Sequence, residues 1–460
     1  MLAKVNWKGF ILPVIIGCVL WIITPFRPAA ITPIAWHLFA LFIATIVACI
    51  TKPLPMVGST LVAVTIGTLL HIFNIKEVSA SFGNTTVWLI AMCLFMSAGF
   101  IRSGLGKRVA YLFIRSFGKR TIGLAYSLST VETLMAIAIS SNIARVNGIM
   151  GSDPKEGTQR KLGSYLIFNE YEVNIVTSTM FLTGLAGNMV ALGIAKTQGI
   201  TVSWMQCFLA AIVPGLISLI LVPFILYKIY PPEVKETPNA NAWASKKLEE
   251  MGKMTPAEKI MACVFVLALL LWLLGSSIGI DATLVGFIAV SILLISGVIT
   301  VKDMMDQKGA WSLIVWLSIV MLMSQKLMKL GFFPWFSKEL GLMLHGVNWV
   351  WVLVILFLVY FYIHYMFPSI TTQSSAVLAG FLSIALGAGV PKLMAGLMLG
   401  FAGSIFCSTT PYSAGPAALL STTGYVKSSD WWKLSAIFGV SLNIVWLGGG
   451  LLWTKIIGFW

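Results

Sequence analysis

The sequence predicts an all-α membrane protein that crosses the bilayer many times. Hydrophobic residues make up 58% of the 460 residues and charged residues only 10%, whereas a soluble domain carries about 25% charged residues. A water-soluble fold of this length could not bury so much apolar surface, so we expect lipid to solvate most of it. The apolar residues also form long runs separated by short polar segments, as membrane-spanning helices require.

About eleven of these runs are long enough for a membrane helix of ~20 residues. We expect the first run to be retained as a span, because no small-residue cleavage site follows it. Two further apolar regions, 121–148 and 349–386, are each interrupted by a polar cluster, and they are predicted to be hairpins that enter the membrane and turn back. The predicted spans lie near residues 10–25, 34–51, 55–73, 86–101, 163–183, 206–229, 258–275, 283–301, 311–330, 391–407 and 434–453.

Basic residues indicate the orientation. Lys4 and Lys8 precede the first span, Lys52 follows the second, and six Lys or Arg residues lie between 102 and 120. Lys and Arg are enriched in cytoplasmic loops, so the N-terminus is predicted to be cytoplasmic and, with an odd number of spans, the C-terminus outside. This rule also explains most of the net charge of +15, and no nucleic-acid partner is predicted.

The chain also shows an internal repeat with an offset of 228 residues. Ser141 then aligns with Ser369 and Gly187 with Gly415, and hydrophobic blocks and polar interruptions coincide as well. We expect an N-terminal first span (1–30), a first repeat (31–230), a cytoplasmic linker (231–257) and a second repeat (258–460). Because each repeat contains an odd number of spans, the second is inverted, which is a frequent plan in secondary transporters.

The two hairpins are interrupted at matching positions. The clusters are ISSNIAR at 139–145 and MFPSITTQSS at 366–375. Non-helical backbone at membrane depth is tolerated only where protein or water satisfies it, and free N–H groups at helix starts favour anions. The two clusters are therefore predicted to form a binding site, although Ser and Asn could instead join neighbouring helices.

A second pair of interruptions follows the hairpins. The segments are LTGLAGN at 182–188 and STTPYSAGP at 408–416. Gly and Pro break helices, so both segments are predicted to be unwound stretches within spans that converge on the hairpin tips. The alternative is that each segment is only a kink.

Arg145 is the cation nearest to a predicted tip. A guanidinium inside a membrane needs a partner, and it can bind a carboxylate with two parallel hydrogen bonds. Arg145 could therefore bind substrate, pair with Glu132, or extend to the cytoplasmic rim beside Arg160 and Lys161. Among the other ionisable residues, Lys326 and Lys329 are expected at an interface and His364 in the core.

Motifs for catalysis, nucleotide binding and metal binding are missing from the sequence. The six cysteines lie in apolar stretches and none has C-x-x-C spacing, so they are expected to be small buried residues. The sequence therefore predicts no enzyme, no cofactor and no metal site.

These segments together resemble the divalent-anion/sodium symporter family, over nearly the whole chain. The chain is most similar to the exchanger branch, which includes 2-oxoglutarate/malate, citrate/succinate and tartrate/succinate antiporters of bacteria and plastids. The residues that carry the resemblance are SNIAR at 141–145, the linker from PPE at 231–233 to WA at 243–244, FYIHY at 361–365, TPY at 410–412, GYV at 424–426 and DWWKL at 430–434.

The resemblance implies a homodimer in a bacterial inner membrane, with a transport part that moves like an elevator against a scaffold. It implies that substrate carboxylates bind at Ser141, Asn142, Ile143, Thr183, Gly184, Ser369, Ile370, Thr371, Thr410 and Pro411, with Arg145 nearby. Two departures stand out: Ile143 replaces the threonine of a Ser-Asn-Thr motif, and Thr371-Thr372-Gln373 replaces Thr-Ala-His at the second tip.

The resulting functional expectation is sodium-independent exchange of dicarboxylates such as 2-oxoglutarate, malate and succinate. Arg145 could take over the work of a bound sodium ion and leave the empty carrier with an uncompensated charge, which would oblige it to exchange. The alternatives are a sodium-coupled symporter with the same fold and, from another class, an anion channel.

Overall fold

The computed structural model is helical throughout the part of the chain it describes, residues 6–137, 139–149, 162–344, 346–367, 369–411 and 414–460. Nine helical segments in these ranges are long and apolar enough to cross a membrane. Three shorter apolar helices, Trp7–Ile22, Met56–Leu69 and Ala282–Ile295, accompany them. The all-α membrane architecture predicted from composition is therefore confirmed.

The helices of the first half are α1 (Trp7–Ile22), α2 (Pro33–Thr51), α3 (Met56–Leu69), α4 (Ile75–Ser81), α5 (Thr85–Ser103), α6 (Leu105–Phe117), α7 (Thr121–Ala136), α8 (Asn142–Ile149), α9 (Ser164–Met180), α10 (Ala186–Thr197), α11 (Trp204–Ile229) and α12 (Ala240–Met251). Those of the second half are α13 (Pro256–Ile278), α14 (Ala282–Ile295), α15 (Val301–Met305), α16 (Lys308–Lys329), α17 (Phe332–Met343), α18 (Trp349–Ile363), α19 (Ile370–Gln373), α20 (Ala379–Gly387), α21 (Lys392–Ile405), α22 (Gly415–Ser421), α23 (Ser428–Asn443) and α24 (Gly450–Ile456).

Helix breaks occur where the polar clusters predicted them. In the first predicted hairpin, α7 ends at Ala136 and α8 begins at Asn142; in the second, a 3₁₀ turn (His364–Met366) separates α18 from α19. The 3₁₀ turns η3 (Leu182–Gly184) and η6 (Phe406–Thr409) interrupt the two spans that follow. Pro368, Tyr412 and Ser413 of the predicted clusters lie outside the described residues.

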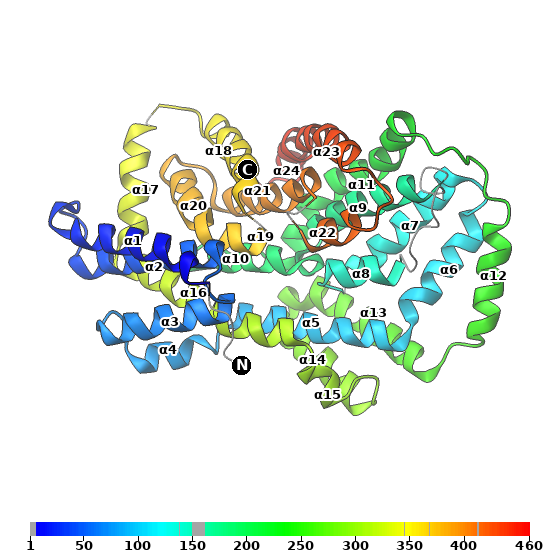
Figure 1. Ribbon diagram of the computed structural model, residues 1–460, viewed down its shortest axis with the longest axis horizontal. Helices are drawn as coiled ribbons and strands as arrows, with labels where there is room; N and C mark the ends of the chain where they lie inside the picture. Colours follow the sequence, from blue (N-terminus) through cyan, green and yellow to red (C-terminus); the bar gives the residue numbers. More distant parts are fainter. Residues whose placement is uncertain (1–5, 138, 150–161, 345, 368, 412–413) are drawn as a thin grey trace.

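One span is shorter than predicted, and two charged segments contain helices that the sequence analysis did not indicate. The span predicted at 283–301 ends at Ile295, because a turn with Gly297 at φ +73° follows α14. The segment 231–257, predicted to be a linker, contains the helix α12, and the basic stretch after the fourth span forms the helix α6. Their many charged residues concealed both helices, which lie side by side at one end of the molecule (Figure 1).

Arg108 fixes α6 to the connection between α12 and α13. Its Nε and Nη2 donate to the two carboxylate oxygens of Glu258 at 2.6 and 3.1 Å, and its Nη1 donates to the carbonyl of Gly252 at 2.9 Å. Glu258 also completes a capping box with Thr255 at the start of α13. One nearly buried arginine therefore positions two helices and the intervening loop.

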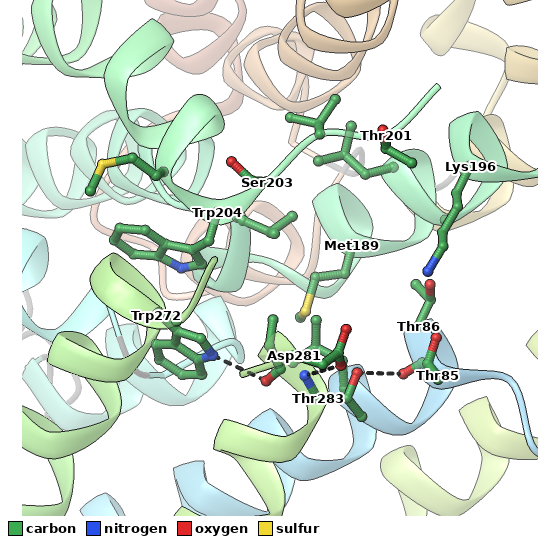
Figure 2. Close-up of a pocket in the computed structure, with 18 of the residues that line it drawn as sticks. Thr85, Thr86, Met189, Lys196, Thr201, Ser203, Trp204, Trp272, Asp281 and Thr283 are labelled. Carbon is green, nitrogen blue, oxygen red and sulfur yellow. Dashed lines mark hydrogen bonds between the residues drawn. The ribbon is translucent and has the colours of Figure 1, made fainter. Parts of the chain in front are cut away.

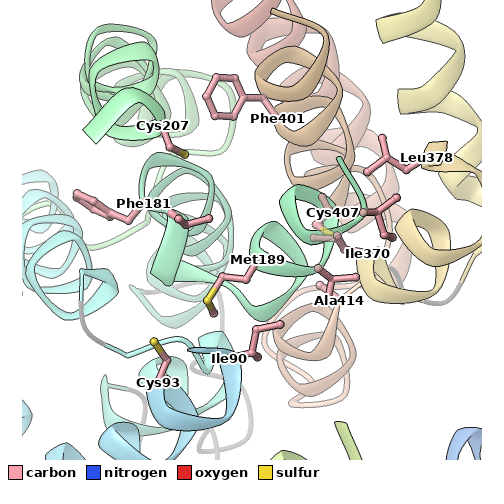
Figure 3. Packing of buried hydrophobic residues seen from close by; sticks show 14 of the residues in the cluster. Ile90, Cys93, Phe181, Met189, Cys207, Ile370, Leu378, Phe401, Cys407 and Ala414 are labelled. Atoms are coloured by element: carbon pink, nitrogen blue, oxygen red, sulfur yellow. The ribbon is translucent and has the colours of Figure 1, made fainter. Parts of the chain in front are cut away.

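The hydrophobic core connects the two halves of the chain. Figure 3 shows Ile90 of α5 and Met189 of α10 close to Ile370 and Cys407 from the second half. Most residues of the helices α9, α10 and α21 are buried, so these helices form the centre around which the broken segments lie.

Candidate functional site

The first tip lies at the start of α8. Asn142 is nearly buried, and its carbonyl accepts a hydrogen bond from Nδ2 of Asn174 at 3.3 Å. Ser141 is partly exposed, and Ile143 exposes 40% of its surface. The tip therefore presents a hydroxyl group and an apolar side chain on a backbone that α9 holds in place.

The second tip lies at the start of α19 and is built from hydroxyl groups. Ser369 caps the helix, since its Oγ accepts from the backbone N–H of Thr372 at 3.3 Å. The same Oγ lies 3.0 Å from the hydroxyl of Thr371 and 2.9 Å from that of Thr372. Ser369 and Thr371 are partly exposed, and Ile370 between them is buried.

Each tip contacts the broken span of the other half. The side chain of Ile143 lies directly against Gly415, at the start of α22. In the matching contact, a Cβ on Gly187 of α10 would lie 2.5 Å from Cγ2 of Ile370. Neither site has room for a larger residue, so two glycines allow the tips of one half to approach the unwound segments of the other.

Arg145 joins the first tip to the first broken span. Its Nε donates to Oε1 of Glu132 at 2.6 Å, its Nη1 to the carbonyls of Ile139 and, at 2.7 Å, Gly184, and its Nη2 to Oγ of Ser178 at 2.6 Å. The side chain has no exposed surface. The predicted pairing with Glu132 is thus confirmed. The alternative position at the rim involved Arg160 and Lys161, which lie outside the described residues.

This ion pair corrects the charge argument made from the sequence. Glu132 matches the charge of Arg145 within the same half of the chain, and both side chains are fully buried. The empty carrier therefore does not keep an uncompensated guanidinium there. The arginine instead supplies a fixed cation that donates hydrogen bonds to two backbone carbonyls beside the tip.

The remaining predicted residues are also held by the protein. The hydroxyl of Thr183 donates to the carbonyl of Ile137 at 2.8 Å and accepts from Nε1 of Trp204 at 3.2 Å. Tyr171 of α9 donates to the carbonyl of Thr410 at 2.9 Å. Thr183, Gly184 and Thr410 are buried, whereas Pro411 is partly exposed. The partly exposed residues of the predicted set are thus Ser141, Ile143, Ser369, Thr371 and Pro411.

Of the other ionisable residues, His364 occupies the core position that the sequence predicted. His364 is fully buried and stacks on Phe406 with ring centroids 4.5 Å apart. Lys326 forms a partly exposed ion pair with Glu77 at 2.7 Å, and Lys329 is exposed. Among the described residues, no hydrogen bond or ion pair joins either lysine to the tips.

A separate cavity of about 310 Å³ lies between α10 and α11 on one side and α5, α13 and α14 on the other. Figure 2 shows Lys196, Thr86 and Asp281 around it, with Trp204 and Trp272 at one end. None of the predicted site residues lines it. Trp204 nevertheless connects it to the site, because its indole donates to Thr183.

Sequence reasoning missed the polar side of α9. This helix carries Asn169, Glu170, Glu172 and Asn174, all fully buried. The run NEYEVN was visible inside the span predicted at 163–183, and ionisable residues within a membrane segment are costly and often functional. That run was the signal, and it identifies α9 as the polar support of the first tip.

The helical arrangement is similar to that of a solved membrane protein. The YdaH transporter of Alcanivorax borkumensis has a similar structure, with a TM-score of 0.60 at 14% sequence identity over 98% of both chains. The chain itself belongs to the family described as the sodium:sulfate symporter transmembrane region, whose pattern matches residues 4–460. The resemblance inferred from the motifs is confirmed.

Two relatives are similar over nearly their full length. YflS of Bacillus subtilis (strain 168), described as a candidate malate transporter, is 40% identical over 470 residues, which cover 100% of this chain and 98% of YflS. The citrate/succinate antiporter of Escherichia coli (strain K12) is 34% identical over 470 residues, covering 95% of this chain and 96% of the antiporter.

Proposed function

We propose that this membrane protein exchanges dicarboxylates such as 2-oxoglutarate, malate and succinate, without coupling to sodium. The substrate class is supported by the similarity to relatives named for malate and for citrate and succinate. Exchange is supported by the antiporter among them. The observation that carries the site is the reciprocal packing of each tip isoleucine on a glycine of the opposite half.

The proposed site comprises the eleven residues named from the resemblance. Its partly exposed hydroxyls, on Ser141, Ser369 and Thr371, are the donors for substrate carboxylates. The first N–H groups of α8 and of the helix that starts at Ile370 add donors and a favourable dipole for an anion. Asn142, Ile143, Ile370, Thr183, Gly184, Thr410 and Pro411 shape the site, and Arg145 acts as a positioning residue behind it.

The contacts of Arg145 support the proposed sodium independence. Unwound carbonyls at broken helices are typical ligands of coupling cations in secondary transporters. Here the guanidinium hydrogen-bonds the carbonyls of Ile139 and Gly184. The guanidinium, a cation that is part of the chain, therefore occupies carbonyl oxygens that could otherwise coordinate a sodium ion.

The proposal includes an architecture. Two inverted repeats, 31–230 and 258–460, each form a re-entrant hairpin whose tip packs on the broken span of the other repeat. A transport part moves as an elevator against a scaffold in a homodimer. Helix breaks at Ser141 and Ser369, 228 residues apart, and the paired contacts of Gly187 and Gly415 support the repeat. The protein lies in the inner membrane of a bacterial cell, with its N-terminus in the cytoplasm and its C-terminus outside. During exchange it carries one anion in each direction across this membrane.

Sodium titration separates exchange from the symport alternative. Proteoliposomes loaded with malate would be given labelled 2-oxoglutarate while sodium is replaced by potassium at constant ionic strength. We expect the initial rate to remain constant. A steep rise with sodium would favour a symporter on the same fold, and large substrate currents without exchange would favour a channel.

Replacing Ser141 with alanine tests the site. A hydrogen bond to a charged group contributes about 1.5–3 kcal/mol, so we expect the half-saturating dicarboxylate concentration to rise by about tenfold to a hundredfold. Ser116→Ala is the matched control, because Ser116 is exposed on α6 and donates only within its own helix, to the carbonyl of Leu112. Equal kinetics for the two variants would remove Ser141 from the site.

A further inference from the structure

Three buried carboxyl groups lie on the two helices α7 and α9 behind the first tip. Glu132 lies on α7, and Glu170 and Glu172 lie on α9. None of the three side chains has exposed surface. In the described part of the chain, Arg145 is the cation that contacts this group, and it contacts Glu132.

Glu170 lies one helical turn before Asn174 on α9, and Nδ2 of Asn174 donates to Oε1 of Glu132 at 2.6 Å. Because residues four apart share one face of a helix, the carboxyl of Glu170 lies on the side of α9 that faces Glu132. Oε1 of Glu132 accepts from Arg145 at 2.6 Å, from Nδ2 of Asn174 at 2.6 Å and from Thr177 at 3.2 Å. Its Oε2 and both oxygens of Glu170 receive no hydrogen bond from the described residues. Two ionised carboxylates are acceptors only, so a hydrogen bond between these groups requires a proton on one of them.

Charge balance leads to the same conclusion. Two adjacent carboxylates in one buried site cannot both ionise at low cost, and a buried charge without a partner is strongly unfavourable. Among the described residues, the helices packed most closely against α9 carry two charged groups besides Glu132 on α7 and Arg145 on α8. These are Lys228 of α11 and Lys392 of α21, both exposed at helix ends. The segments η3, η6 and α22 contain no Asp, Glu, Lys, Arg or His.

We propose that Glu170 and Glu132 bind one proton between them, forming a proton site behind the first hairpin tip. The O–H of one carboxyl donates to the other, while the opposite oxygen of Glu132 holds Arg145. With this proton the cluster of Arg145, Glu132 and Glu170 is formally neutral. The guanidinium is then matched to a single carboxylate and stays directed at the carbonyls of Ile139 and Gly184. This site is independent of which solute is transported.

Infrared spectroscopy of the purified protein in lipid tests the proton directly, because carboxylic acids and carboxylates absorb at separate frequencies. At neutral pH we expect a carboxylic C=O component that moves on exchange into D₂O and disappears in Glu170→Gln. The amide of glutamine keeps a donor beside Glu132 without adding charge, so this variant is expected to fold.

Glu172→Gln is the matched control, since Glu172 lies on the same helix with the same burial and neither of its carboxyl oxygens receives a hydrogen bond from the described residues. It should retain the Glu170 component. If Glu170→Gln failed to fold, Glu170→Asp would be used instead. Aspartate is one methylene shorter, so its carboxyl group lies farther from Glu132 and the carboxylic C=O band should shift. A carboxylic spectrum identical to that of the wild type in Glu170→Gln, or in a folded Glu170→Asp, would overturn the proton site. Because no transport is measured, this result is separate from the test of exchange.

Discussion

Arg145→Ala is expected to lose both folding stability and transport. The substitution leaves Glu132 fully buried without its cation, and breaking such a pair costs about 3–5 kcal/mol. It also removes the donors to Ile139, Gly184 and Ser178 that fix the tip to the broken span. The thermal unfolding midpoint of the purified protein and the rate of exchange in proteoliposomes measure the two effects.

Two further variants separate charge from position. Arg102→Ala removes an ion pair with Asp303 whose arginine is 47% exposed, so it should cost less than about 1 kcal/mol. Arg145→Met combined with Glu132→Gln removes both buried charges, which should restore much of the stability but not exchange. An Arg145→Ala protein with wild-type stability and exchange would contradict the role given to this residue.

Gly187→Ala is expected to impair transport with little loss of secondary structure. The new Cβ would lie 2.5 Å from Cγ2 and 3.0 Å from Cβ of Ile370. Because both atoms are close to the Ile370 backbone, the second tip itself must move away from α10. Overpacking of this kind costs about 1–3 kcal/mol, so exchange should fall by roughly fivefold to a hundredfold.

The partner residue provides the control for this prediction. Ile370→Ala removes Cγ2, so the double variant with Gly187→Ala should regain part of the lost activity. Gly415→Ala should have a smaller effect, because it meets the far end of the Ile143 side chain, which is partly exposed and can rotate. If Gly187→Ala exchanged substrate at the wild-type rate, the tip and the broken span would not need this close contact.

Local patterns were sufficient to predict the long apolar helices and the breaks at the polar clusters. Apolar run length gave the spans, and the small polar residues around Ser141 and Ser369 marked the tips because they cannot continue a lipid-exposed helix. The amphipathic helices α6 and α12 were missed, because their basic and acidic residues resemble those of a loop. Only the packing of Arg108 onto Glu258 and Gly252 reveals how α6 is held.

The partners within the site depend on contacts that sequence spacing does not encode. Glu132 was identified as a partner of Arg145 because both are charged residues in one hairpin. Tyr171, in contrast, binds the carbonyl of Thr410, which is 239 residues away in the chain. Likewise, the packing of Ile143 on Gly415 requires the two halves to be assembled. The polar run around Glu170 was visible in the sequence, but a role for the Glu170 carboxyl can be inferred only from the packing of α9 against Glu132.

The most direct test of dicarboxylate exchange compares loaded and empty vesicles. The purified protein in liposomes would be given labelled 2-oxoglutarate in sodium-free buffer, with malate either present inside or absent. We expect uptake into loaded vesicles only, together with release of an equal amount of internal malate. Equal uptake into empty and loaded vesicles would show net transport and contradict exchange as the function of this protein.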